Sequence, residues 1–233
     1  MWSDPPSTPE GAMCFFACTD EGVKRLNALM DDPKNDARPF TALQAEAAKY
    51  EGEHYFKPRL TTAALKTYPL DPADDPGFLR CEPWGLARQM FAPHQLEVRK
   101  KGESEIELRY GEWAARRTVH VDGRARPANE APSPLGYSVG HWEGETLVVE
   151  TSGIAKNITG WDAEHSDQLR VVERFTRSNE GDTLLLTATL DDPWSLKEPV
   201  VLKKIWRWAP DQQITPYENC ERPTEFSRGK SPR

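Results

Sequence analysis

Apolar and polar residues alternate with a period of two through most of the chain after Pro93. Such alternation places successive side chains on opposite faces of a β-strand. The alternating segments are joined by short stretches rich in Gly, Asp, Asn and Pro, which are typical of hairpin turns. The strands expected from this pattern cover residues 96–100, 106–110, 113–121, 142–151, 168–176, 182–190, 200–208 and 213–219.

Strands in sequence with hairpin-length connections form a meander, and a meander leaves two unpaired edges unless it closes. We therefore predict a mainly β fold, an eight-stranded antiparallel up-and-down barrel. A barrel of that size encloses side chains or one small ligand.

The first 78 residues have a different pattern, with helical spacing of apolar residues. We expect helices over residues 21–30, 40–50 and 61–66, the first capped by Thr19 or Asp20. The predicted organisation is a helical and loop-rich N-terminal appendage (1–78), a β-barrel domain (79–222) and a C-terminal tail (223–233).

Composition narrows the classes of partner. The 233 residues carry a net charge of −7 without a basic stripe, which argues against nucleic-acid binding. The apolar runs are too short for a membrane-spanning helix. We expect no cofactor, because the nucleotide-binding glycine motifs, H-E-x-x-H and C-x-x-C are absent from the sequence. Whether the chain forms a homodimer stays open.

The cysteines are Cys14, Cys18, Cys81 and Cys220, an even number that permits disulfides without requiring them. Cys14 and Cys18 lack a second ligand pair, so a zinc site would need the other cysteines or a histidine. A Cys81–Cys220 bridge would tie the ends of the barrel, and buried thiols are the alternative. The N-terminus lacks the pattern of a signal peptide. We expect a cytoplasmic protein, or a periplasmic one whose export signal is not part of this sequence.

One acidic and one basic residue fall on apolar strand faces. Glu173 shares its face with Leu169, Val171 and Phe175, and Arg117 shares its face with Trp113, Ala115, Val119 and Val121. Both should point inward, and a lone buried charge is costly, so the two are natural partners. The pair would orient a polar substrate group or act in acid/base chemistry. The alternatives are a structural pair that sets strand register, or a bulge that turns both residues to solvent.

Two histidines are further acid/base candidates. His141 lies beside Trp142 and Glu143, and His165 lies in a loop just before the strand that carries Glu173. For His141 the alternative is a surface position packed on Trp142. The acidic residues around His165 are too crowded locally to indicate a metal site.

Residues 136–140 match G-x-S-x-G, the nucleophile-elbow pattern with Ser138 as nucleophile. That elbow needs a strand before it and a helix after it, whereas here a Pro-rich loop precedes it and a strand-like run follows. The alternative is that its glycines allow a tight entry to a strand.

The expected barrel is lined by aromatic side chains with a few convergent polar groups. The leading hypothesis is a cofactor-independent lyase or isomerase acting on a small hydrophobic or aromatic molecule, with Glu173, His165, His141 and Arg117 as catalytic residues. The alternatives are a non-catalytic carrier for such a molecule and a serine hydrolase using Ser138. The residues expected to bind the substrate are Tyr110, Tyr137, Trp142, Phe175, Trp206 and Trp208.

Several blocks together resemble a family of bacterial proteins, often exported. Its pattern G-x-S-x-G-x-W-E-G-D/E-T-L-V-V-D/E-T occurs at 136–151, R-x-V-x-x-D-G-R at 117–124 and H-S-x-x-L-x-V-V-E-R-F at 165–175. A D-D-P at 191–193, C-x-P-x-G at 81–85 and a Tyr/Cys/Glu cluster at 217–221 complete the match. The resemblance covers roughly residues 79–222 and implies a calycin-type, lipocalin-like barrel. The resemblance also favours export and a Cys81–Cys220 bridge. It implies a functional role for Arg117, Asp122, Trp142, Glu143, His165, Glu173 and Arg174.

Overall fold

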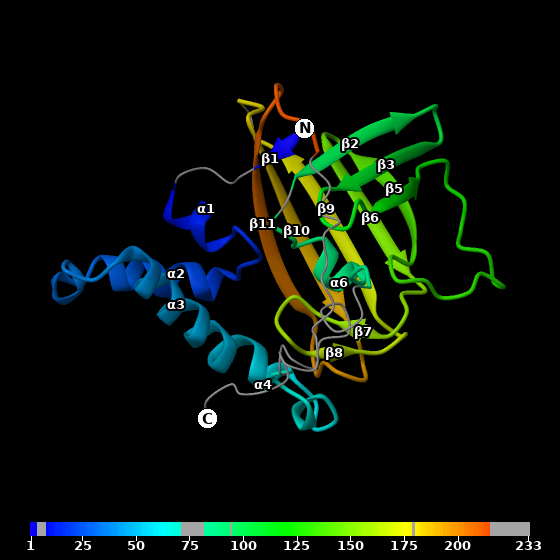
Figure 1. Ribbon diagram of the computed structural model, residues 1–233. Helices are drawn as coiled ribbons and strands as arrows, with labels where there is room; N and C mark the ends of the chain where they lie inside the picture. Colours follow the sequence, from blue (N-terminus) through cyan, green and yellow to red (C-terminus); the bar gives the residue numbers. More distant parts are fainter. Residues whose placement is uncertain (4–7, 71–81, 94, 179, 215–233) are drawn as a thin grey trace, which may run out of the picture.

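Nine strands close into a barrel in the computed structural model, which describes residues 1–3, 8–70, 82–93, 95–178 and 180–214 (Figure 1). The strand order is β1-β11-β10-β9-β6-β5-β4-β3-β2, and β7 pairs with β8 in a separate two-stranded sheet. The strands are β1 (Trp2–Ser3), β2 (Leu96–Lys101), β3 (Glu105–Tyr110), β4 (Arg116–His120), β5 (Tyr137–Glu143), β6 (Thr146–Ser152), β7 (Asn157–Ile158), β8 (Glu164–His165), β9 (Arg170–Arg177), β10 (Thr183–Asp191) and β11 (Val200–Trp208).

The mainly β closed barrel is confirmed, but the prediction of eight purely antiparallel strands is wrong in two respects. β4 and β5 pair in parallel, because residues 121–136 lead back to the end of the barrel where β4 begins. The additional strand, β1, comes from the start of the chain and pairs with both β11 and β2, which closes the barrel. Of the expected strand 213–219, residues 213 and 214 are not in a strand and the rest lies outside the described residues.

Two expected strands are shortened by turns. Trp113 and Ala114 have φ values of 57° and 49°, in the left-handed region, so β4 begins only at Arg116. The run expected as one strand from Trp142 to Thr151 is divided by a turn at Gly144, whose φ is 61°. A glycine reaches such a φ without steric cost, and this allows β5 and β6 to form a hairpin.

The helices of the first 70 residues form largely where apolar spacing predicts them. These are α1 (Pro9–Met13), α2 (Asp20–Met30), α3 (Phe40–Glu51) and α4 (Lys57–Arg59). Thr19 is the N-cap of α2, and its side chain accepts a hydrogen bond from the Gly22 amide. The short helix expected near 61–66 is a 3₁₀ turn at Ala64–Lys66. Further single turns lie at Pro33–Asn35 and Gly52–Phe56.

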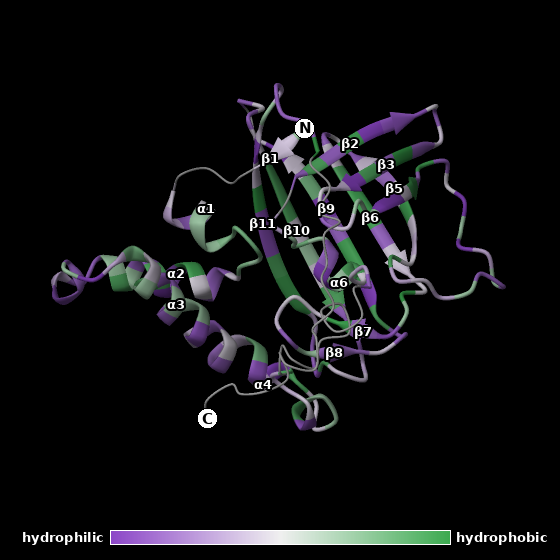
Figure 2. Cartoon of the chain, viewed as in Figure 1, coloured by the Kyte–Doolittle hydropathy of each residue, from purple (hydrophilic) through white to green (hydrophobic). Residues whose placement is uncertain are grey.

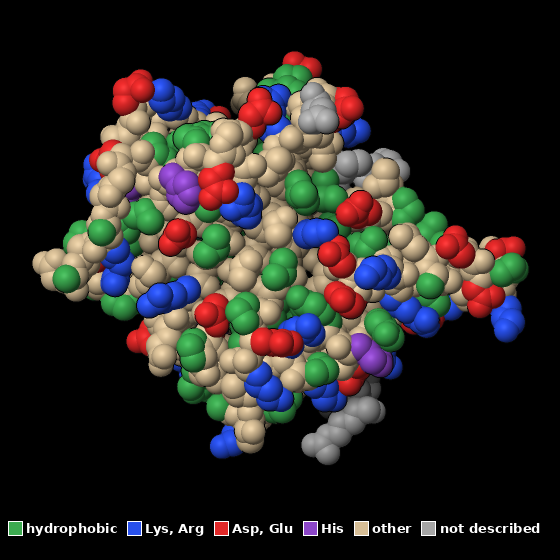
Figure 3. All heavy atoms as spheres, turned by 180° about the vertical axis from the view of Figure 1, so that it is seen from behind, with side chains coloured by type: hydrophobic (Ala, Val, Ile, Leu, Met, Phe, Trp, Pro, Cys, Tyr) green, Lys and Arg blue, Asp and Glu red, His purple; other side chains and the backbone are tan. Residues whose placement is uncertain are grey.

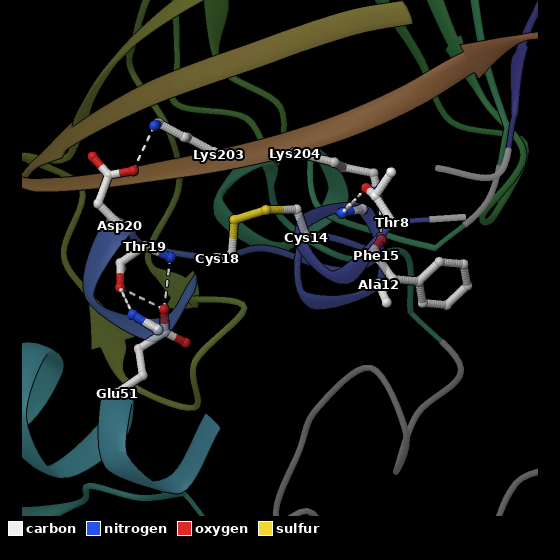
Figure 4. The surroundings of a disulfide bond; sticks show 12 residues. Thr8, Ala12, Cys14, Phe15, Cys18, Thr19, Asp20, Glu51, Lys203 and Lys204 are labelled. Carbon is white, nitrogen blue, oxygen red and sulfur yellow. Dashed lines mark hydrogen bonds and ion pairs between the residues drawn. A yellow bond between two sulfur atoms is a disulfide. The ribbon is translucent and has the colours of Figure 1, made fainter. Parts of the chain in front are cut away.

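Helices α1, α2 and α3 lie beside the barrel next to β11 (Figure 1). Their apolar faces form a small second core with Ile205, which points outward from β11. Cys14 and Cys18 form a disulfide between α1 and α2 (Figure 4). The backbone of Cys18 pairs with that of Lys203 in β11. The range expected as an appendage therefore contacts the barrel directly. Cys81 and Cys220, the other expected bridge, lie outside the described residues.

The main core fills the inside of the barrel, and the strands show the alternation of apolar and polar residues expected from the sequence (Figure 2). Inward side chains such as Leu108, Val149 and Leu186 pack with residues of α6 (Leu86–Gln89) and the segment after it, which includes Met90 and Phe91. The outer surface seen in Figure 3 carries acidic, basic and apolar side chains interspersed. Among the described residues, no helix has the length and apolarity to cross a membrane.

The contact between α2 and α3 depends on a glycine. A Cβ at Gly22 would lie 2.5 Å from Oε1 of Glu51, the buried carboxylate that accepts hydrogen bonds from the amide and hydroxyl of Thr19, each at 2.6 Å. Burial raises the pKa of Glu51. We expect Gly22→Ala to lower the free energy of unfolding by about 1–3 kcal/mol through overpacking, measured by urea denaturation.

Gly52→Ala is the matched control, because the nearest atom to its Cβ is the Tyr68 hydroxyl at 3.5 Å and its backbone is helical. It should be neutral or stabilising by up to about 1 kcal/mol, as helix propensity favours alanine. Equal stability of the two variants would contradict the close packing at Gly22.

Candidate functional site

An apolar pocket of about 290 Å³ opens at one end of the barrel. The register brings the end of β9, the start of β10 and the end of β11 together here, since Leu184 pairs with both Arg177 and Trp206. The end of β5 adds Trp142, and β1 adds Trp2. We call this pocket the barrel mouth; its lining is Trp2, Val98, Leu108, Trp142, Glu145, Leu147, Phe175, Arg177, Leu184 and Trp208.

The barrel mouth exposes large aromatic surfaces. Trp142 is 58% exposed and Trp208 is 44% exposed, although both are on the inward side of their strands. Trp2 packs edge-to-face against Trp208 with ring centroids 5.0 Å apart, and the Arg177 guanidinium lies 5.7 Å from the Trp2 ring. Exposed apolar area gathered in a concave site marks a binding site more often than scattered apolar residues do.

Arg117 and Glu173 form the inward-facing ion pair that the alternation predicts. Nη1 of Arg117 lies 2.7 Å from Oε2 of Glu173, and Nη2 donates a hydrogen bond to Oε1 at 2.9 Å. Both side chains are buried. Burial alone would lower the pKa of Arg117, but the negative charge of Glu173 outweighs it and the pKa is raised. The geometry of this prediction is confirmed; a catalytic role for either residue stays a prediction.

Tyr110, expected to bind substrate, is buried near this pair. Its hydroxyl has no hydrogen-bond partner among the described residues, and burial raises its pKa. The ion pair and Tyr110 therefore form a polar cluster within an apolar core.

The structure does not bring the two histidines to this cluster. His165 is buried in β8, where Nδ1 lies 2.9 Å from the carbonyl oxygen of Ser166, and burial lowers its pKa. His141 is exposed on the outer face of β5, with Nε2 3.2 Å from Glu143, which in turn pairs with Arg174. Within the described residues, neither histidine is hydrogen-bonded or ion-paired to Arg117 or Glu173.

Ser138 does not occupy a nucleophile elbow. It lies inside β5, its side chain is buried, and its hydroxyl is hydrogen-bonded to that of Thr151 at 2.9 Å. The strand continues after it instead of giving way to a helix, so the G-x-S-x-G match has no elbow geometry. Gly136 has a φ of 67° and no room for a Cβ, which fits the tight strand entry weighed as the alternative.

The remaining predicted binding residues separate into three groups. Trp142, Phe175 and Trp208 line the barrel mouth. Trp206 is buried in the core. Tyr137 points outward from β5, stacks on His120 with ring centroids 4.8 Å apart and lines a second pocket on the side of the barrel.

Lys204 is a buried charged residue that the sequence interpretation missed. It points into the barrel between Leu202 and Trp206, and its Nζ donates to the carbonyl oxygens of Phe15 at 2.6 Å and Ala92 at 2.7 Å. Burial lowers its pKa to about 7. The signal was present in the sequence, because Lys204 occupies an inward position of an otherwise apolar face.

No group of three or more His, Cys, Asp or Glu side chains in the described part of the chain could hold a metal ion. Cys14 and Cys18, weighed above as zinc ligands, are joined in the disulfide. The crowded residues around His165 likewise make no such group.

The chain matches no protein-family model, and it matches no curated protein. Among solved structures it is similar to a mutant of the fluorescent protein UnaG, with 16% identity and a TM-score of 0.30 over 50% of this chain and 71% of that one.

Proposed function

We propose that this protein binds a small, largely apolar molecule in the barrel mouth, as a carrier or binding protein. The observation that carries the proposal is the pair of inward-facing but solvent-exposed tryptophans, Trp142 and Trp208, over an apolar floor of Leu108, Leu147 and Leu184. A ligand seated there would remove this aromatic surface from water, which contributes about 25 cal/mol per Å² of apolar area before the entropy cost of association is subtracted.

The size and polarity of the barrel mouth define the ligand class. Its volume of about 290 Å³ suits a molecule of one or two rings. Arg177 and Glu145 at the rim offer one donor group and one acceptor group, enough to orient a single polar substituent. This class is the hydrophobic or aromatic molecule expected from the sequence.

A binding function is better supported than the lyase or isomerase hypothesis. Arg117 and Glu173 are paired with each other, and His141 and His165 have partners elsewhere. General acid/base catalysis needs a proton-transfer group within hydrogen-bond reach of the substrate. Within the described residues, no contact joins either histidine to the Arg117–Glu173 pair. The sequence resemblance implies a calycin-type barrel, and we include this classification in the proposal.

The proposal can be tested with the neutral fluorescent probe N-phenyl-1-naphthylamine. We expect saturable binding with enhanced fluorescence. Trp142→Ala and Trp208→Ala should each weaken binding about tenfold, the equivalent of about 1.4 kcal/mol for a lost ring contact. The measurement is a fluorescence titration at constant protein concentration.

Trp194→Ala is the matched control, because Trp194 follows β10 at the opposite end of the barrel, where Lys156 lies 5.3 Å from its ring. It should leave the dissociation constant unchanged. Absence of saturable binding to the wild-type chain, or equal weakening by all three substitutions, would exclude the barrel mouth as the site.

A further inference from the structure

A second pocket, of about 550 Å³, opens on the side of the barrel beside β4 and β5. β4 and β5 pair at only two positions, Val119 with Ser138 and His120 with Val139. Before these pairs the two strands are not hydrogen-bonded to each other. We call this opening the side pocket; Arg117 and Ser138, both inward-facing, belong to its lining.

Aromatic rings form the walls of the side pocket. Trp84 and Trp113 pack edge-to-face with centroids 6.4 Å apart, and His120 stacks on Tyr137. The guanidinium of Arg88, which is not part of the lining, lies 4.2 Å from the centroid of the Trp84 ring. Rings arranged in this way favour a flat aromatic guest, which can stack or pack edge-on against them.

The backbone at Trp113 is held in a conformation that non-glycine residues avoid. Trp113 and Ala114 both have left-handed φ values, each costing about 1–3 kcal/mol. The turn they form places the Trp113 indole in the pocket wall. Strain of this kind clusters at binding sites, where the surrounding structure maintains it.

The charges at the side pocket are balanced. Arg117 is neutralised by Glu173, and the exposed Arg116 is accompanied in the lining by Glu130. An anionic guest would approach Glu173 and gain little from Arg117. However, Nε of Arg117 is buried without a hydrogen-bond partner among the described residues, and an unsatisfied buried donor costs about 1–3 kcal/mol.

We propose that the side pocket is a second binding site, for a flat aromatic molecule that carries a neutral carbonyl oxygen. The rings of the guest molecule stack between the Trp84–Trp113 pair and the His120–Tyr137 pair. Its carbonyl oxygen is directed toward Arg117 and Ser138. This site is distinct from the barrel mouth, whose lining shares no residue with it.

The probe is 7-amino-4-methylcoumarin, a neutral fluorescent two-ring lactone. We expect saturable binding to the wild-type chain by fluorescence titration. Trp113→Gly should weaken it at least tenfold while leaving the fold intact, because glycine adopts the left-handed φ without strain. Trp84→Ala should weaken it as well, since it removes the partner ring.

N-phenyl-1-naphthylamine binding separates this proposal from that for the barrel mouth. It should be unaffected by Trp113→Gly, and coumarin binding should be unaffected by Trp142→Ala. Coumarin affinity that is lost with Trp142→Ala but kept with Trp113→Gly would assign the probe to the barrel mouth and overturn the side pocket as a site. Absence of coumarin binding to the wild-type chain would also overturn it, whatever the result with N-phenyl-1-naphthylamine.

Discussion

Glu173→Gln is expected to lower the free energy of unfolding by about 3–5 kcal/mol. The substitution is nearly isosteric, but it removes the negative charge that faces Arg117 at 2.7 Å. Arg117 is only 3% exposed and stays charged at any pH the protein survives, so it would remain as an uncompensated charge in the core. Urea denaturation of the wild type and the variant measures the difference.

Two further variants make this prediction specific. Glu150→Gln changes an exposed glutamate on the outer face of β6 and should stay within about 0.5 kcal/mol of the wild type. Replacing the pair together, Arg117→Met with Glu173→Leu, should recover much of the lost stability, since no buried charge remains. A Glu173→Gln variant as stable as Glu150→Gln would show that the pair is hydrated in solution.

The second large effect concerns pH and Lys204. Its pKa is about 7 in the folded protein against an ordinary value of 10.5. Between these pH values the unfolded chain binds the additional proton, so stability rises with pH across this window. The cost of burying the charged ammonium group lowers the stability by its full amount below about pH 7, and this loss is relieved as the pH approaches 10.5. The gain is on the order of several kcal/mol, since each pH unit corresponds to about 1.4 kcal/mol.

Lys204→Gln tests this because the amide can still donate to the carbonyl oxygens of Phe15 and Ala92 but does not titrate. The difference in unfolding free energy between wild type and Lys204→Gln, measured from pH 7 to pH 10, should shift steadily in favour of the wild type. Lys203→Gln is the matched control: Lys203 is the next residue, is partly exposed and pairs with Asp20. Lys203→Gln should keep the increase in unfolding free energy with pH that the wild type shows. Parallel plots of unfolding free energy against pH for all three proteins would contradict the burial of Lys204.

The secondary structure and the facing of side chains were predictable because they depend on neighbours in sequence. A period of two assigns Arg117 and Glu173 to the inner faces of β4 and β9 whatever these strands pair with. The same rule applied to β11 would have placed Lys204 inside. Helix α2 was predictable from its Thr19 cap and the apolar spacing that follows it.

The composition of the candidate sites was only partly predictable. Trp142, Phe175 and Trp208 are aromatic residues on inward positions, and all three line the barrel mouth. A surface position for His141 was one of the two alternatives from the sequence, and His141 does face outward, beside Glu143. The sequence did not indicate that His165 would bond to its neighbouring carbonyl. Whether residues on different strands meet depends on strand order and register, which no local pattern encodes.

The sequence by itself determined most of the strands and which of their side chains enter the core, because pleating and burial act within a few residues. Only the tertiary structure decided that Trp2 and Ser3 close the barrel, that β4 and β5 run in parallel, and that Cys14 bonds to Cys18. The closure by β1 and the parallel pairing of β4 with β5 join segments far apart in sequence, and residues of these strands line the two pockets. Pairing two distant segments costs loop-closure entropy, and the packing of the whole chain must offset that cost. This balance is set by the complete fold and not by any local stretch of sequence.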